Sequence, residues 1–258
     1  MNKAYLQAYY RLEREHWWFV VRGKIIRDRV QSWAAQGKPD PKILNVGAAT
    51  GKTSELLEAF GEVTSIEYDE GCVAFVRKTL NIPIIQASIL DLPYADQTFD
   101  LVCAFDVIEH VENDQRAAAE LHRVCKPGGA ILVTVPAFNQ LWSHHDVVNQ
   151  HFRRYTRKTL QKLWVASDFE RSNTTYFNTF LFPPIWLFRR ISRFIPAQWI
   201  RREAGSDFSV PGSRGWITRI FYLVFSLERL CLSYISFPFG VSLMWMGKTN
   251  SRKINNYE

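Results

Sequence analysis

The sequence lacks the marks of an exported, disulfide-bonded or membrane-spanning protein. Only four of its 258 residues are cysteines, and they are scattered, with no C-x-x-C pair. Such spacing predicts reduced, buried thiols in a cytoplasmic protein, and neither a disulfide framework nor a zinc site. The N-terminal segment carries Glu13 and Glu15, which a signal peptide would not. The longest apolar stretch, residues 216–246, is broken by charged residues and by Pro238, so we expect no spanning helix.

Repeats and low-complexity tracts are also absent, and the composition is that of a folded globular protein. Hydrophobic residues make up 47% of the chain, charged residues 22%, and the formal net charge is +7. These values exclude disorder as the main state and predict one large core. Aromatic residues are abundant, at 14%, and gather near the N-terminus and in the last third of the chain.

Short apolar runs alternate with helical stretches between residues 42 and 136. This alternation predicts βαβ units and an α/β fold with a mainly parallel sheet. We expect strands at 42–46, 62–67, 82–87, 100–105, 130–135, 171–177 and 241–247, and helices at 52–60, 70–80, 113–124 and 216–236. Two further helices are expected between residues 4 and 36, and another after Thr156 as its N-cap.

A glycine-containing turn, Gly47 to Gly51, follows the first expected strand. At this place an open α/β sheet binds nucleotide-like ligands, and glycine lets the backbone approach them closely. Glu67 ends the second strand about twenty residues later, where a carboxylate can accept hydrogen bonds from ribose hydroxyls. The two features predict an adenosine-containing cofactor, while the missing Walker lysine argues against a nucleoside triphosphate.

Four segments carry a family resemblance. ILNVGAATGKTSELL, SIEYDE, IIQASILDLPYADQTFDLVCAFDVIEHV and LHRVCKPGGAILVTVP resemble the class I S-adenosylmethionine (SAM)-dependent methyltransferases, the type-11 and type-23 groups in particular, over about residues 42–169. The resemblance implies SAM as cofactor, S-adenosylhomocysteine as product, and a Rossmann-like, seven-stranded doubly wound sheet of order 3-2-1-4-5-7-6. It also implies cofactor contacts from the following residues: Asn45, Gly47, Ala48 and Gly51 near the methionine part, Glu67 and Tyr68 at the ribose, Ser88 and Ile89 at the adenine, Phe105 and Asp106 at the amino end, and His110 closing the pocket.

Three positions depart from the family pattern. Asn45 and Ser88 stand where acidic residues are common, and Ala49 stands where glycine is common. Because Asn and Ser still form hydrogen bonds, we expect weaker cofactor binding and not its loss. The departures leave open a catalytically inactive scaffold. The leader HWWF with Arg22 resembles helices that close over the cofactor, so Arg22 is a candidate for the cofactor carboxylate; ordinary packing of these aromatics is the alternative.

A histidine-rich segment follows the fifth expected strand, where such folds place acceptor-binding loops. Our candidate catalytic residues are His110, His144, His145, Asp146 and His151, and our candidate acceptor-binding residues are Arg153, Arg154 and Tyr155. A histidine paired with Asp146 could serve as a general base, and arginines bind phosphate or carboxylate groups. The same residues could instead tie neighbouring elements together. We expect no metal, because no helix carries an H-x-x-x-H pattern.

A basic and aromatic segment precedes the last expected strand. It holds seven arginines: Arg189, Arg190, Arg193, Arg201, Arg202, Arg214 and Arg219. Between them lie bulky apolar residues, among them Phe182, Trp186, Phe194, Ile195, Trp199 and Ile200. This mixture is typical of helices in a membrane interface, where anionic headgroups attract the arginines. A helical cap with solvated arginines is the alternative, and we expect no nucleic-acid partner.

The sequence therefore predicts a four-part chain: a helical lid (1–40), a SAM-binding core (41–178), a helical insertion (179–239), and a last strand with a tail (240–258). We expect methyl transfer to oxygen of an amphipathic or lipid-linked acceptor at the inner face of the cell membrane. A soluble small-molecule O- or N-methyltransferase is the alternative enzyme. The acceptor's identity and the oligomeric state are not predicted.

Overall fold

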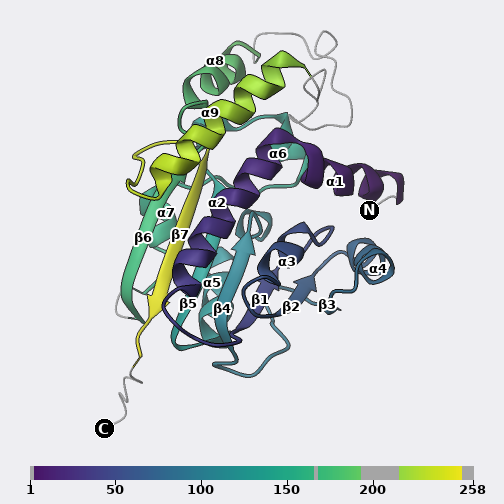
Figure 1. Cartoon of the computed structure of the whole chain (residues 1–258), viewed down its shortest axis with the longest axis vertical. Helices are drawn as coiled ribbons and strands as arrows, with labels where there is room; N and C mark the ends of the chain where they lie inside the picture. The colour runs from purple at the N-terminus through teal and green to yellow at the C-terminus, as the bar shows by residue number, and fades with distance from the viewer. Residues whose placement is uncertain (1–2, 166–167, 193–214, 252–258) are drawn as a thin grey trace.

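A seven-stranded sheet of order β3-β2-β1-β4-β5-β7-β6 forms the centre of the computed structural model (Figure 1). The structure describes residues 3–165, 168–192 and 215–251. The strands are β1 (Lys42–Val46), β2 (Glu62–Glu67), β3 (Ile84–Gln86), β4 (Phe99–Phe105), β5 (Cys125–Pro136), β6 (Phe169–Phe177) and β7 (Ser242–Thr249). The predicted strand order and the Rossmann-like fold are confirmed.

Strands β1 to β5 are parallel, and β7 runs antiparallel between β5 and β6. Leu44 of β1 lies opposite Thr64 of β2 on one side and Val102 of β4 on the other. Every residue of β4 is buried, as expected for a central strand covered on both faces. The carboxyl ends of β1, β2, β4 and β5 consequently meet at one edge of the sheet, where a doubly wound fold binds its ligand.

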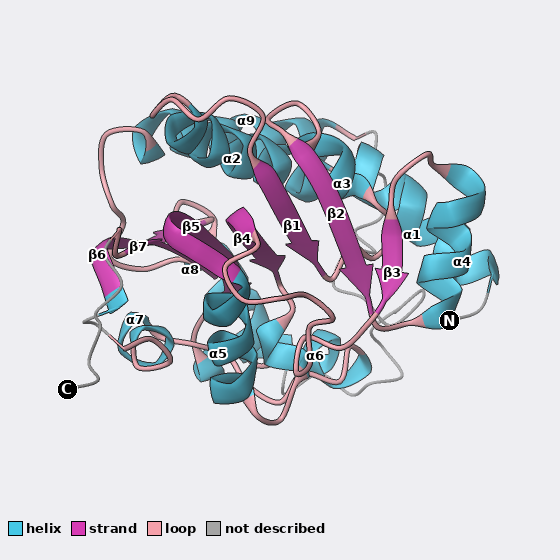
Figure 2. Cartoon of the chain, turned by 90° about the horizontal axis from the view of Figure 1, so that it is seen from below, coloured by secondary structure: helices cyan, strands magenta, loops and turns pink. Residues whose placement is uncertain are grey.

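Helices cover both faces of the sheet. Figure 2 shows α2, α3 and α9 on one face and α5 and α7 on the other. The helices are α1 (Lys3–Glu15), α2 (Trp17–Ala34), α3 (Lys52–Leu57), α4 (Glu70–Thr79), α5 (Asp114–Val124), α6 (His144–Val148), α7 (Arg157–Gln161), α8 (Phe182–Ser192) and α9 (Trp216–Leu232), with short 3₁₀ turns η1 (Ile108–His110) and η2 (Asn139–Leu141). Thr156 is the N-cap of α7, as predicted.

Helices α2 and α9 come from opposite ends of the chain and pack side by side (Figures 1 and 2). Arg229 forms a two-pronged ion pair with Asp28, at 2.6 and 2.8 Å, and Lys24 Nζ donates to the Tyr222 hydroxyl at 2.6 Å. Trp17 packs on Phe225. The expected lid and insertion are therefore joined in one layer, and their boundaries as separate parts stay a prediction.

Strand β5 begins earlier than the sequence indicates. We expected this strand to begin at residue 130, yet Cys125 already lies opposite Phe99 of β4, with a register shift before Leu101. Gly128 has a φ of +73°, and the Thr249 hydroxyl donates to the carbonyls of Lys126 and Gly129. Contacts with β4 and β7 thus draw residues 125–129 into the sheet.

The basic segment is described only in part. Arg193, Arg201, Arg202, Arg214 and the apolar residues Phe194, Ile195, Trp199 and Ile200 lie outside the described residues. Among the helices that the structure describes, none is long and apolar enough to cross a membrane.

Candidate active site

The turn after β1 is built so that only small residues fit. Gly47 and Gly51 have φ values of +74° and +87°, which favour glycine. A Cβ on Gly47 would lie 2.4 Å from Val107 Cγ2, and one on Gly51 would lie 2.5 Å from Leu80 Cδ1. Ala48 is buried beside them. The turn therefore brings bare backbone to the ligand-binding edge of the sheet.

Asn45, at the end of β1, fastens this turn to α3. Its side-chain amide donates to the hydroxyls of Thr53 and Ser54, both at 2.9 Å. The residue is fully buried, and its Oδ1 atom has no hydrogen-bond partner. Asn45 thus positions the turn, and a contact with the cofactor stays a prediction.

Glu67 ends β2 beside the turn and organises its backbone. Its Oε2 accepts from the Ala49 N–H at 2.8 Å, and its Oε1 accepts from the N–H groups of Tyr68 and Asp69 at 2.8 and 3.0 Å. A carboxylate offers about four acceptor sites, so at least one remains for a ribose hydroxyl. Tyr68 is 77% exposed next to it.

The two residues predicted at the adenine follow β3. Ser88 forms a small turn in which its hydroxyl accepts from the Leu90 N–H at 3.1 Å. Ile89 is buried. Their contact with a base stays a prediction.

Arg22 of α2 and Asp106 after β4 form an ion pair of 2.5 Å. Arg22 also donates to the Thr134 hydroxyl, at 3.2 Å, and its guanidinium lies over the ring of Phe105. The Nε–H of Arg22 is buried without a partner, while the Asp106 side chain is 28% exposed. One cation and one anion side by side suit the carboxylate and ammonium groups of an amino acid, so these residues fit the methionine end of SAM.

The N-terminal helix α1 contacts the glycine turn directly. The Thr50 hydroxyl donates to the Glu13 carboxylate, and Arg14 pairs with Glu55 of α3 at 2.9 Å. Burial of Glu13 raises the pKa of its carboxyl to about 7. The sequence analysis did not single out Glu13. Its burial becomes evident only in the fold, where α1 lies against the glycine turn.

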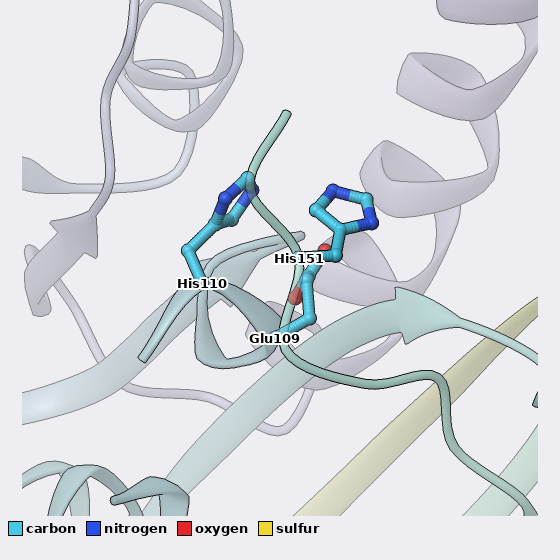
Figure 3. Close-up of side chains that lie close together, drawn as sticks. All are labelled: Glu109, His110 and His151. Atoms are coloured by element: carbon cyan, nitrogen blue, oxygen red, sulfur yellow. The ribbon is translucent and has the colours of Figure 1, made fainter. Parts of the chain in front are cut away.

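Two histidines and a glutamate gather at the carboxyl end of β4. Figure 3 shows Glu109 and His110 from η1 beside His151 from the loop after α6. One ligand atom from each of the three lies within 4.8 Å of the others, and the two imidazole centroids are 4.6 Å apart. Part of the His110 side chain reaches solvent, but the protein atoms packed around its ring and the neighbouring His151 lower its pKa to about 4, so that the ring is neutral.

Glu109 is the member of this group that the sequence analysis missed. It is fully buried, and neither carboxylate oxygen has a hydrogen-bond partner. Desolvation and the nearby charge of Asp106 raise its pKa well above the usual value. Its position next to His110 in the DVIEH segment was the available signal.

Asp146 holds His151 in place. The imidazole Nδ1 of His151 lies 2.9 Å from Asp146 Oδ1, and Arg154 donates to both oxygens of Asp146, at 2.7 and 3.0 Å. Burial alone would raise the pKa of Asp146, but the hydrogen bond from His151 and the charge of Arg154 hold it well below its usual range. The structure thus pairs Asp146 with His151, whose Nε2 is not used in this contact.

The other residues of the segment have different surroundings. His144 is exposed on α6, and the ring of His145 lies 3.1 Å from Asn149 Nδ2. Their catalytic roles stay predictions.

The three residues predicted to bind the acceptor all have internal partners. Arg153 pairs with Asp114 at 2.7 Å, and the Tyr155 hydroxyl donates to the same carboxylate at 2.8 Å. Arg154 is buried against Asp146. These contacts position the loop, and direct contact with the acceptor stays a prediction.

Fold and site together are those of a class I SAM-dependent methyltransferase domain. Residues 44–133 match the family described as a methyltransferase domain, so this part of the chain carries that domain. The donor cofactor of the class is SAM, as predicted.

Curated relatives agree with this domain assignment, and a solved structure agrees with the fold. The chain is 28% identical over 165 residues to a demethylmenaquinone methyltransferase of Chlorobaculum parvum, covering 63% of this chain and 64% of that protein. It is 32% identical over 127 residues to a Mycolicibacterium smegmatis protein named probable SAM-dependent methyltransferase, covering 48% of each. A structure of a SAM-dependent methyltransferase from Thermotoga maritima has the same fold, with a TM-score of 0.58, 15% identity, and coverage of 96% of this chain and 97% of that one. The chain thus spans about half to two thirds of the length of these curated relatives.

Proposed function

We propose that this protein transfers a methyl group from SAM to oxygen of an amphipathic or lipid-linked acceptor at a membrane surface. SAM supplies an electrophilic methyl group on a sulfonium. The chain's own residues contribute the cofactor turn, the Arg22–Asp106 pair and the cluster of Glu109, His110 and His151 near the expected acceptor loops. The observation that carries the membrane part of the proposal is the outward face of α9.

Helix α9 presents an apolar stripe to solvent. Its members recur every three or four residues, which places them on one side of the helix. The side chains of this stripe are between 45 and 89% exposed. They are Trp216, Ile220, Leu223, Leu227 and Leu230 on the helix, and Tyr234 just beyond its end. The opposite side, with Phe225 and Leu232, is buried against the core. A row of exposed bulky side chains of this length is unusual for a surface that meets only water.

Helix α8 extends the same kind of surface. Leu187, Phe188 and Ile191 are each more than half exposed. Arg190 and, on α9, Arg219 are exposed as well. Apolar side chains with arginines among them match an interface of acyl chains and anionic headgroups, where each basic residue contributes about 1 kcal/mol.

This surface is connected to the candidate acceptor loops. Arg189 of α8 donates to the Leu141 carbonyl in η2, and Phe182 packs edge-on against Phe138 at 5.9 Å between ring centroids. Both loop residues lie between β5 and α6, the helix that carries Asp146. The similarity to a relative named demethylmenaquinone methyltransferase also favours an apolar acceptor.

Methyl transfer can be tested with SAM that carries an isotopically labelled methyl group. The full chain is incubated with total lipid extract in vesicles and, separately, with the aqueous metabolite extract. We expect label in the organic phase. The labelled product should survive treatment with base, as a methyl ether does. Label in the aqueous extract alone would identify a soluble small-molecule methyltransferase, and no binding of SAM would identify an inactive scaffold; each result overturns the proposal.

Membrane binding can be tested by sedimentation with vesicles. We expect the protein to sediment with vesicles rich in anionic lipid at low salt and less so at high salt. Leu223→Asp with Leu227→Asp should leave the protein in the supernatant. Val165→Asp is the matched control, because Val165 is 62% exposed but lies after α7. Equal sedimentation of both variants, or none by the unaltered chain, would contradict the membrane part.

A further inference from the structure

The cluster of Glu109, His110 and His151 is assembled from two separate segments. η1 follows β4, whereas His151 lies in the loop after α6. The Phe152 N–H donates to the Glu109 carbonyl at 2.8 Å, which ties the two segments together at this point. The potential ligand atoms of the three side chains lie within 4.8 Å of one another. The fold therefore gathers two imidazoles and one carboxylate at the carboxyl end of the sheet.

Glu109 is the member of this cluster whose charge lacks a partner among the described residues. Its side chain is fully buried, and neither oxygen accepts a hydrogen bond from the described residues. Figure 3 shows its carboxylate beside His151, with the His110 ring opposite, and one of its oxygens lies within 4.8 Å of a ring nitrogen of each histidine. A buried carboxylate without a partner is costly, and a cation at this place would remove the cost.

His151 is held as metal-binding histidines are held. Its Nδ1 lies 2.9 Å from Asp146, and Arg154 fixes Asp146 through two further hydrogen bonds. A carboxylate behind one ring nitrogen sets the tautomer and leaves the other nitrogen as a ligand. His110 is open to solvent, which gives an ion a route of entry.

We propose that Glu109, His110 and His151 bind one divalent transition-metal ion of the zinc class. Two imidazole nitrogens and a carboxylate oxygen are a donor set that zinc accepts in catalytic sites, where a fourth position stays open. This proposal departs from our expectation of no metal, which rested on the lack of an H-x-x-x-H pattern on a helix; the three ligands proposed here come from two separate segments.

On the proposed function, the open position takes the acceptor oxygen. Coordination lowers the pKa of the bound hydroxyl, so its proton leaves to solvent. An oxygen lone pair then forms the bond to the methyl carbon, while the carbon–sulfur bond breaks and its electrons stay on sulfur. The metal would in this way replace a histidine base, and Nε2 of His151 would be a ligand.

Metal binding can be measured without any methyl acceptor. The full chain is freed of metal with a chelator and titrated with zinc by calorimetry and with cobalt(II) by absorption, which reports the coordination geometry. We expect one ion per chain with a four- or five-coordinate cobalt spectrum. Glu109→Gln and His110→Ala should each abolish the spectrum, and Asp146→Asn should weaken binding by about 10- to 100-fold.

His122→Gln is the matched control, since His122 lies on α5 against Phe169 and outside the cluster. It should bind zinc as the unaltered chain does. Thermal unfolding and SAM affinity are recorded for every variant, and His110, being open to solvent, can change without loss of the fold. No binding by the unaltered chain, or binding that survives both cluster variants, would overturn the metal site. Metal binding without methyl transfer to lipid would instead overturn only the proposed acceptor.

Discussion

Arg22 and Asp106 are 84 residues apart in the sequence and form an ion pair of 2.5 Å at the carboxyl end of the sheet. One comes from the helix that precedes the sheet, and the other from the turn after β4. Asp106 has a φ of +56°, and its N–H donates to the Thr134 carbonyl at 2.8 Å, so the turn aims the carboxylate at α2. The pair links the N-terminal helices to the expected cofactor pocket.

Replacing Arg22 should weaken SAM binding. Arg22→Ala removes the cation beside Asp106 and the unpartnered Nε–H that fits a ligand carboxylate. We expect a loss of about 1 to 3 kcal/mol in binding free energy, the range for hydrogen bonds to charged groups. Calorimetric titration with SAM and with S-adenosylhomocysteine measures it.

Arg229→Lys serves as the control for the Arg22 variant. Arg229 also pairs with an acid of α2, at 2.6 Å, but it lies on α9. The Arg229→Lys variant should be less stable than the unaltered chain and should bind SAM with unchanged affinity. Equal effects of both variants on affinity would show that Arg22 acts only through helix packing.

Glu67→Ala should also weaken SAM binding by about 1 to 3 kcal/mol, since the carboxylate both fixes the Ala49 N–H and is placed for a ribose hydroxyl. The same titration, compared with Glu70→Gln, tests it. Glu70 is an exposed acid at the start of α4. A Glu67 variant that binds SAM normally would remove this residue from the site.

Ala49→Gly should stabilise the protein. Ala49 has a φ of +47°, a left-handed backbone that costs a residue with a Cβ about 1 kcal/mol or more. The gain should be of that order in the free energy of unfolding by denaturant. Ala87→Gly, at a position without a positive φ, should instead lower stability. If both changes destabilise to a similar extent, the strain assigned to Ala49 is wrong.

The carboxyl of Glu13 should make stability fall as pH rises from about 5 to 8. Burial raises its pKa from 4.5 to about 7, so the folded state binds the proton more tightly than the unfolded state. Stability from this group is therefore greatest below pH 4.5 and declines until about pH 7, by up to about 3 kcal/mol.

The comparison of Glu13→Gln with the unaltered chain isolates this effect. The amide removes the ionisation, so the variant should be the more stable protein at pH 8, and the difference should vanish near pH 4.5. Glu15→Gln is the control, because Glu15 is exposed on the same helix. Denaturant unfolding at several pH values measures both. A difference that stays constant from pH 5 to pH 8 would contradict the raised pKa.

Local patterns were enough to predict individual strands and the cofactor turn, whereas the order of the strands was what the family resemblance implied. The alternation of apolar runs and helices predicted β1 and β2 with their observed bounds, and the Gly47 turn with Glu67 predicted a nucleotide-like ligand. These features depend on neighbours close in sequence: a strand's apolar run, a turn's need for glycine, a helix N-cap such as Thr156. Periodicity alone did not reveal the early start of β5, because its first residues are held by pairing with other strands.

The sequence by itself thus determined the class of fold, the donor cofactor and the presence of a histidine-rich loop. Only the tertiary structure decided which residues meet: Arg22 with Asp106, Glu13 with Thr50, Asp146 with His151, and Glu109 with two histidines. It also decided which side of α9 remains uncovered. The physical reason is that periodicity predicts whether a residue is buried. Which residue it contacts depends on how segments that are distant in the sequence pack together at the edge of the sheet.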